Sequence, residues 1–198
     1  GADPNNQRQD GISALMAASS NGHVEVVDLL LKQDADVNVK DKDGLTALIS
    51  ASENGSVPLV RLLLDAKPEI NILSTTGFSP LIISSAHGHL EITKMLVENG
   101  AEVDLEHPEA VTALMYAAAG GFPDTVKYLL DNGAQVNARH KQGGSALMEA
   151  CTAGNYSVVT TLIDAGADAM IIDKDGVTTM MSAASQGHTE VVKLLIEK

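Results

Sequence analysis

Apolar and polar positions along the chain recur with a single spacing. Glycines stand 33 residues apart at six places, leucines follow the same spacing with a methionine in the last copy, and a hydroxyl residue precedes each of these by two positions. The three series are Gly22, Gly55, Gly88, Gly121, Gly154 and Gly187; Leu15, Leu48, Leu81, Leu114, Leu147 and Met180; and Ser13, Thr46, Ser79, Thr112, Ser145 and Thr178. A fixed period of this length predicts an array of stacked structural repeats.

Within one period the pattern predicts two short helices. The first is expected over residues 46–54, where the hydroxyl of Thr46 can cap the free backbone N–H groups. After a break at Gly55, the second is expected over residues 57–64, with Pro58 in the first turn, where its missing N–H costs little. Because two helices cannot bury both their apolar faces alone, neighbouring units must stack.

The stretches DGLTALISASENG and TGFSPLIISSAHGHLEITKMLVENGAEVD resemble ankyrin repeats, whose 33-residue unit carries the signature T-P-L-H-x-A. The resemblance covers essentially the whole chain. It implies an all-α ankyrin-repeat solenoid of stacked helix-turn-helix units with protruding β-turn tips. In the family the signature histidine bridges turn backbones, so we expect its replacements here to pack as apolar residues and the turns to be less rigid. The replacements are Met16, Ile49, Ile82, Met115, Met148 and Met181.

The repeats are expected to form one array over residues 1–198. Residues 1–7 match the tail of a preceding repeat, and the last helix lacks the polar outer face of a capping repeat. We therefore expect the sequence to be a segment of a longer chain. The repeats span about 8–40, 41–73, 74–106, 107–139, 140–172 and 173–198, the last one truncated.

Composition and charge narrow the possible partners. The net charge of −13 argues against nucleic acid and against an anionic membrane surface, since both require clustered Lys and Arg. No apolar run approaches the roughly 20 residues that cross a bilayer, so no membrane insertion is expected. The single cysteine, Cys151, cannot form an internal disulfide, which fits a reducing compartment. We expect a cytoplasmic protein, with a nuclear location also open.

Candidate metal sites have simpler structural explanations. DKDG at 41–44 and 173–176 resembles part of a calcium loop, but the remaining acidic ligands are missing and a tight turn explains both copies. His87 and His89 lie two apart, with His107 further on, so no two imidazoles share a helical face. One repeat position at the start of the second helix is shared by His23, His89 and His188.

No catalytic pattern stands out, and no cofactor is expected. Cys151 falls at a first-helix position where the other copies have small residues, so we expect a buried spacer rather than a reactive thiol. The other residues at this position are Ser19, Ser52, Ser85, Ala118 and Ala184. No nucleophile stands beside a base and the glycines are periodic, which predicts no enzyme activity, although a site built from distant repeats stays open.

The chain could itself be modified. Asn38 and Asn71 end the stretches DVN and EIN at matching distances from Leu30 and Leu63, an arrangement that resembles asparagine-hydroxylation sites of ankyrin repeats. The alternative is a turn-forming asparagine, which we favour.

A row of residues just after each tip glycine is a candidate binding surface. Five of its six members are apolar at a place expected to be largely exposed, which indicates a contact surface. The alternative is that each tip packs against its neighbour. The row consists of Ile12, Leu45, Phe78, Val111, Gly144 and Val177.

Helical spacing adds a second row on the first helices. In the middle repeats it consists of Ser50, Glu53, Asn54, Ile83, Ala86, His87, Tyr116, Ala119 and Gly120. Tyr116 is its only aromatic residue, and aromatic residues often carry much of the energy of an interface. Glu149, at the corresponding position of the next repeat, joins Tyr116 as a candidate.

Charge is uneven along the chain. Between Lys94 and Lys127 there is no Lys or Arg. Acidic residues in this stretch are Glu98, Glu102, Asp104, Glu106, Glu109 and Asp124, whereas the basic residues near other tips are Lys40, Lys42, Arg139, Lys141 and Lys174. An acidic centre flanked by basic tips would steer a partner with a basic segment, mainly through association rate. The alternative is a solvated acidic surface that maintains solubility.

These patterns favour a protein–protein interaction module, such as a scaffold, inhibitor or targeting domain. The competing hypotheses are a regulatory part of a larger enzyme or channel and a passive spacer. The candidate partner-binding residues are Ile12, Lys42, Leu45, Asn54, Phe78, His87, Glu109, Val111, Tyr116, Lys141, Glu149, Lys174 and Val177.

The tip of the fourth repeat departs from the others. EHPEAVTALM, residues 106–115, has Ala110 where the other five copies have glycine, and Pro108 removes one N–H. We expect this tip to be rebuilt, and it is a candidate for partner specificity. Drift in a tolerant loop is the alternative.

Overall fold

The computed structural model describes residues 2–105 and 107–198, which form twelve helices in consecutive pairs. The first helices of the pairs are α1 (Ala14–Ser20), α3 (Ala47–Asn54), α5 (Pro80–Ala86), α7 (Ala113–Gly120), α9 (Ala146–Ala153) and α11 (Thr179–Ser185). The second helices are α2 (Val24–Leu31), α4 (Val57–Asp65), α6 (Leu90–Glu98), α8 (Pro123–Asp131), α10 (Tyr156–Asp164) and α12 (Thr189–Glu197). The all-α prediction and the two helices predicted for the second repeat are confirmed. Among the described residues, no helix has the length and apolar character needed to span a bilayer.

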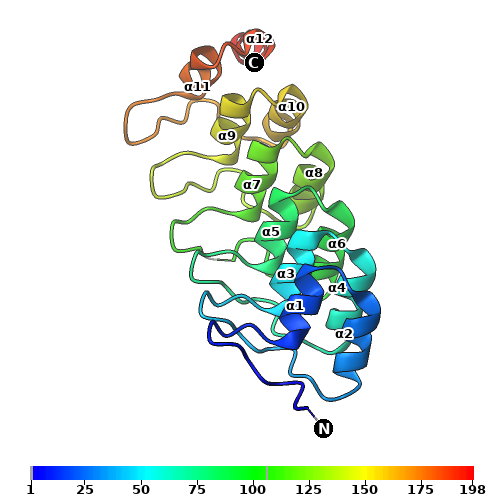
Figure 1. Ribbon diagram of the computed structural model, residues 1–198. Helices are drawn as coiled ribbons and strands as arrows, with labels where there is room; N and C mark the ends of the chain where they lie inside the picture. The colour runs from blue at the N-terminus through cyan, green and yellow to red at the C-terminus, as the bar shows by residue number, and fades with distance from the viewer. Residues whose placement is uncertain (1, 106) are drawn as a thin grey trace. The chain divides into compact units, whose positions relative to one another are not determined.

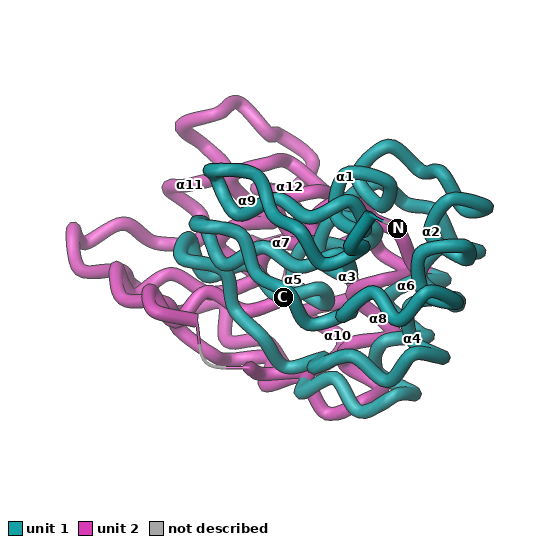
Figure 2. The backbone as a smooth tube through the Cα atoms, turned by 60° about the horizontal axis from the view of Figure 1, so that its bottom comes forward, with its two compact units in different colours: residues 1–84, 91–102 teal, residues 85–90, 103–198 magenta. Residues whose placement is uncertain are grey.

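The chain divides into two compact units, residues 1–84 with 91–102 and residues 85–90 with 103–198 (Figure 2). In the first unit, α1 lies beside α3 and α2 beside α4 (Figure 1). In the second unit, α9 packs between α7 and α11, while α10 packs between α8 and α12 (Figure 1). Each unit is thus a stack of helix pairs in two layers. The single continuous array stays a prediction.

Hydroxyl side chains start the first helices, as predicted. The Oγ1 atom of Thr46 accepts a hydrogen bond of 3.3 Å from the N–H of Ile49, three residues along. The same bond recurs from Met16 to Ser13, Ile82 to Ser79, Met115 to Thr112, Met148 to Ser145 and Met181 to Thr178. Gly55 ends α3 in the left-handed conformation, which a side chain would strain. Local chemistry thus fixes the start of all six first helices, and a left-handed glycine ends α3, α7 and α9.

The leucine series forms the centre of the core. Its five leucines are at most 2% exposed: Leu15, Leu48, Leu81, Leu114 and Leu147. The residues that replace the signature histidine are buried as predicted in five of six repeats. The exception is Met181, which is 56% exposed, whereas Met115 at the corresponding position is 1% exposed. The prediction of apolar packing is therefore wrong for Met181, because no helix pair among the described residues covers that face of α11.

In five of the six repeats, the side chain at the start of the tip holds the turn without the family's histidine. In the second repeat, Asp41 Oδ1 accepts hydrogen bonds from the N–H groups of Asp43 (2.9 Å) and Leu45 (2.8 Å). Asp173 does the same for the N–H groups of Asp175 and Val177. The DKDG stretches are therefore turns closed by their own first aspartate. Neighbouring tips are also joined within each unit, as where Lys42 N–H donates to Asp10 C=O at 3.0 Å.

The fourth tip keeps the shape of the others. Ala110 has a φ of +56°, within the left-handed region that the tip glycines occupy. Its N–H donates to the carbonyl of His107, and Nδ1 of His107 accepts from the N–H of Glu109 at 2.9 Å. The prediction of a rebuilt tip is therefore wrong for the described residues, and Glu106 lies outside them. Pro108 stands at the position of Lys42 and has no N–H to donate to a preceding tip.

An asparagine at the end of the repeat joins consecutive repeats. Asn71 Oδ1 accepts from the N–H of Glu102 at 2.9 Å, and its Nδ2 donates to the carbonyl of Gly100 at 3.2 Å. Asn38 Oδ1 likewise accepts from the N–H of Glu69 at 2.8 Å. These bonds give both candidate hydroxylation residues a structural role, while their modification stays a prediction.

Asp104 takes the asparagine position in the third repeat. Its Oδ2 atom accepts from the N–H of Gln135 at 3.0 Å, as the asparagine oxygen does elsewhere. Its Oδ1 atom is buried and has no partner, at the place where Asn71 and Asn137 present a donor. A carboxylate cannot donate, so this repeat lacks half of the bridge.

The two methionine positions should respond differently to truncation. Met115→Ala should lower the free energy of unfolding by about 2–5 kcal/mol because it empties a filled core position. Met181→Ala should cost less than about 0.5 kcal/mol because this side chain is mostly in water. Urea unfolding monitored by circular dichroism measures both. Equal losses would contradict the burial described above.

Replacing Asp104 by asparagine should stabilise the protein. Asp104→Asn supplies the missing donor and removes a buried unpaired carboxylate oxygen, so the free energy of unfolding should rise by about 1 kcal/mol. The reverse change, Asn71→Asp, should lower it by a similar amount. Thermal unfolding of both variants is the measurement, and a drop in melting temperature for Asp104→Asn would refute this account.

Ala110→Gly should also stabilise the protein. Glycine relieves the left-handed backbone strain at this tip, an effect of about 1 kcal/mol. The control is Ala17→Gly on the exposed side of α1, where the same change should destabilise by about 1 kcal/mol through helix propensity. Denaturant unfolding should show changes of opposite sign in the free energy of unfolding for the two variants. Two losses of similar size would show that Ala110 is not strained.

Candidate functional site

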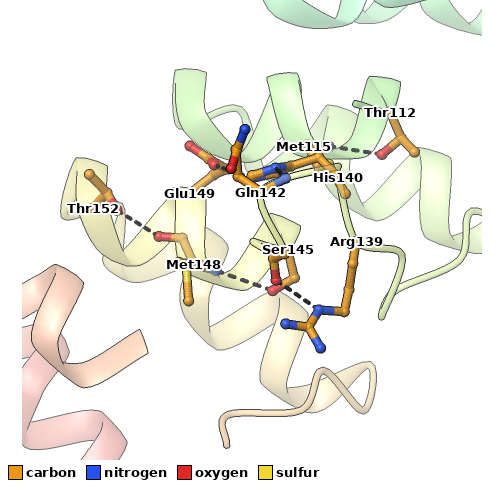
Figure 3. Close-up of polar contacts among 10 residues, drawn as sticks. Thr112, Met115, Arg139, His140, Gln142, Ser145, Met148, Glu149 and Thr152 are labelled. Atoms are coloured by element: carbon orange, nitrogen blue, oxygen red, sulfur yellow. Dashed lines mark hydrogen bonds and ion pairs between the residues drawn. The ribbon is translucent and has the colours of Figure 1, made fainter. Parts of the chain in front are cut away.

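The two candidate side chains at the centre of the site, Tyr116 and Glu149, come from two first helices of the second unit. Tyr116 lies on α7 and Glu149 on α9, at the same position of consecutive repeats. The helices bury their leucine and methionine faces, so these two side chains emerge on the partly exposed side. The caps at Thr112 and Ser145 set where each helix begins (Figure 3).

The tip before α9 brings a histidine to these side chains. His140 stands at the position of Asp41, and its Nδ1 atom accepts from the N–H of Gln142 at 3.1 Å (Figure 3). The backbone N–H of His140 donates to the carbonyl of Gly144, and the backbone carbonyl of His140 accepts from the N–H of Gly143. Arg139 closes the same tip, with its Nε 2.7 Å from the carbonyl oxygen of Gly143. The ring is therefore fixed by the turn that it helps to build.

His140 and Glu149 lie within ion-pair distance of each other. The Nε2 atom of His140 lies 3.3 Å from Oε1 of Glu149, with the side chains 17% and 36% exposed (Figure 3). Since Nδ1 accepts a backbone N–H, the ring proton of a neutral imidazole lies on Nε2, the nitrogen nearest the carboxylate. The ring of His140 therefore lies beside the carboxylate of Glu149 at a position that the tip fixes.

Gly144 makes room for the imidazole. A Cβ atom at this position would overlap Nε2 of His140. The tip row has an apolar side chain at the other five positions, so the single glycine is explained by the close approach of this ring rather than by the row itself. Gly144 and His140 thus depend on each other.

These residues line an open pocket of about 180 Å³ formed by Val111, Met115, Tyr116, Ala119, His140 and Glu149. Burial, followed by the negative charge of Glu149, raises the pKa of the Tyr116 phenol. Its hydroxyl therefore stays protonated at neutral pH and can donate a hydrogen bond. The pocket combines an apolar wall, an aromatic ring, a phenol and a carboxylate.

The first unit forms a pocket from the same repeat positions. It has a volume of about 260 Å³, and its lining includes Ile12, Met16, Ala17, Asp41 and Ser50. These are the counterparts, three repeats earlier, of Val111, Met115, Tyr116, His140 and Glu149. The repeat therefore produces a pocket at this place in both units, but of the two only the pocket of the second unit has an aromatic ring. The carboxylates of the first-unit pocket are those of Asp41 and Glu53, whereas Ser50 stands at the position of Glu149.

The tip row is less exposed than predicted. Ile12, Leu45, Phe78, Val111 and Val177 are half-buried. Leu45 and Phe78 pack against a core cluster that contains Ile49 and Ile83. The expectation of a largely exposed row is therefore wrong, and part of each side chain serves tip packing as in the alternative hypothesis. Ile12, Leu45 and Val111 also contribute to the two pockets.

Two other candidates have structural partners. Asn54 Nδ2 donates to the carbonyl of Ser20 at 3.1 Å and so joins two repeats. The ring of His87 stacks on that of His89, with 5.8 Å between centroids. Both candidate side chains are exposed, but neither lies in the two pockets.

The charged candidates lie on the exposed tips. Lys42 and Lys174 are exposed and form no ion pair with another described residue. Lys141 lies 3.4 Å from Oε1 of Glu109, so this predicted basic tip pairs with a member of the predicted acidic centre. Of that centre, Glu98 and Glu102 belong to the first unit, and Glu106 lies outside the described residues.

No reactive centre emerges from the geometry of the described residues. Cys151 is fully buried, and burial raises the pKa of its thiol to about 12, which confirms the spacer interpretation. No group of three or more His, Cys, Asp or Glu side chains in this part of the chain is arranged to hold a metal ion. The Nε2 atom of His188 lies 3.0 Å from the carbonyl oxygen of Thr152, in line with the structural role predicted for its position.

Sequence reasoning missed His140. The one signal in the sequence that could have pointed to His140 was Gly144, the exception in the tip row. A glycine leaves space that the side chain of another residue can occupy. The two residues are four apart in a loop, so only the fold shows that the ring reaches Glu149.

Comparison with known proteins fits this architecture. The family model for ankyrin repeats in sets of three copies matches residues 1–74, 33–107, 59–140, 81–173 and 114–198. A comparison with curated proteins gave no match. Among solved structures, the ankyrin repeat domain of human ASB11 is similar, with 28% sequence identity and a TM-score of 0.89 over 98% of this chain and 88% of that one. The overlapping family matches span the whole chain, and this protein therefore belongs to the ankyrin-repeat family.

Proposed function

We propose that this protein is a protein-binding module that holds a segment of another protein against its tips and first helices, without catalysing a reaction. Ankyrin repeats are generally modules that bind other proteins, which supports the proposal at the level of the family. The observation that carries it for this chain is the pocket of Tyr116, His140 and Glu149.

The side chains that distinguish this pocket, Tyr116 and Glu149, stand at positions that the framework does not need. Caps use the hydroxyl series, the core uses the leucine and methionine series, and the inter-repeat bridges use the asparagines. The remaining side chains of the tip and the first helix are free to differ between repeats. They differ most between the two pockets, where Tyr116 and Glu149 replace Ala17 and Ser50. Variation on a common scaffold is how repeat proteins acquire a specific partner.

The chemistry of the surface favours a partner segment with basic character. The chain carries a net charge of −13, which attracts basic proteins and raises their association rate. Tyr116 supplies an aromatic contact of the kind that often dominates interface energy. Together they support a role as a scaffold, inhibitor or targeting domain for such a partner.

Affinity capture with two tyrosine variants tests this proposal. Tyr116→Ala should weaken binding of a captured partner by about 10-fold or more, as expected for an aromatic residue central to an interface. Tyr156→Ala removes a half-exposed tyrosine from α10, outside the pocket, and should leave binding unchanged. Dissociation constants come from surface plasmon resonance, and circular dichroism confirms that both variants fold. Capture of no specific partner, or equal binding by both variants, would refute the proposal.

A further inference from the structure

The Tyr116 pocket has a net negative charge that its own residues leave uncompensated. Glu149 lies 3.3 Å from Nε2 of His140, and the Nδ1 atom of this ring accepts the N–H of Gln142, as an uncharged imidazole does. Lys141, the next residue along the tip, is 3.4 Å from Glu109. Arg139 is held by the carbonyl groups of Gly143 and Ile172. The charges of this tip are thus engaged away from the pocket, and the Glu149 carboxylate faces a ligand with its charge intact.

The size of the pocket selects a single side chain. Its volume of about 180 Å³ is well below the roughly 300–1,000 Å³ of sites that enclose drug-sized molecules. It is close to the roughly 150 Å³ of an engineered protein cavity that takes up one benzene molecule. The pocket therefore has room for one long side chain projecting from a bound segment.

The lining favours a cation with an apolar stem. Val111, Met115 and Ala119 offer apolar surface to methylene groups, and Glu149 offers a carboxylate. Tyr116 adds an aromatic ring, which attracts cations through its π-face. A guanidinium is planar, weakly hydrated and able to bind a carboxylate through two N–H groups while it stacks on a ring, so arginine fits this combination better than lysine.

We infer that the Tyr116 pocket is the recognition site for an arginine side chain of the partner segment. The inference rests on the proposed protein-binding function and specifies its chemistry. The guanidinium pairs with Glu149 beside the ring of Tyr116, and the imidazole of His140 lies beside the same carboxylate. The corresponding pocket of the first unit has Ala17 in place of Tyr116 and so lacks the aromatic ring. Its carboxylates, Asp41 and Glu53, stand at other repeat positions than Glu149, and its lining also includes the cationic Arg8.

Selection from a library of random dodecapeptides tests the inference. Peptides enriched on the wild-type protein should contain arginine at one common position. Replacing that arginine by citrulline, which keeps its shape and removes its charge, should weaken binding about 10- to 100-fold, the range expected for a charge-assisted pair beside an aromatic ring. Fluorescence anisotropy of labelled peptides measures the dissociation constants.

Protein variants assign the effect to the pocket. Glu149→Gln keeps the shape of the side chain and should weaken binding of the arginine peptide about as much as the citrulline replacement does. Combining Glu149→Gln with the citrulline peptide should cause little further loss of affinity. Gly144→Val should also weaken binding, because its side chain displaces His140. The matched control is Glu25→Gln, which removes an exposed carboxylate on α2 outside the pocket and should change binding less than about twofold.

The outcomes separate this inference from the proposed function. Enriched peptides without arginine, or arginine peptides that bind Glu149→Gln as tightly as wild type, would overturn the arginine site and leave protein binding standing. Equal losses of affinity for Glu149→Gln and Glu25→Gln would show that only the net charge of the protein matters, and this would also overturn the arginine site. Enrichment of no peptide would overturn the arginine site, and the absence of any captured partner would in addition remove the proposed function.

Discussion

Each helix pair of this protein has more apolar surface than it can bury by itself, and the constant register of 33 residues lets neighbouring pairs cover it. An insertion of one residue would rotate Leu48 or Leu114 away from the next repeat and place a polar side chain in the core. The requirement accounts for much of the sequence, because the caps, the glycine breaks and the inter-repeat asparagines orient neighbouring pairs within each unit. Met180 and Met181 show the converse, since they are exposed where no pair among the described residues covers them.

The turns show that the same structural role, closing the tip, can be filled by residues at different positions of the repeat. The family's histidine is replaced by apolar residues, yet the tips are closed by the side chain at their first position. Aspartate does this in Asp41 and Asp173, and histidine does it in His107 and His140. All four side chains accept a backbone N–H two residues along. Once the turn needs only an acceptor, the rest of the side chain is available for other contacts, which is how His140 also reaches Glu149.

The left-handed backbone positions were predictable where glycine marks them and unexpected where it does not. Asp34, Lys67 and Ala110 interrupt two glycine series, and all three keep positive φ values. A single residue contributes about 1 kcal/mol of strain, whereas the hydrogen bonds and packing of the whole repeat favour the common shape. Tertiary context therefore overrides the local preference, and this is why the rebuilt fourth tip predicted from Ala110 and Pro108 does not occur.

The sequence by itself determined the repeat, the helices, their hydroxyl caps and the leucine core, because these depend on short-range preferences repeated at one spacing. It also identified Tyr116 and Glu149 as side chains on a common face. Only the tertiary structure decided how exposed the tip row is, and that His140 enters the space left by Gly144 to meet Glu149. Burial and pairing of this kind depend on distances between side chains of separate elements, which residue spacing along the chain does not contain.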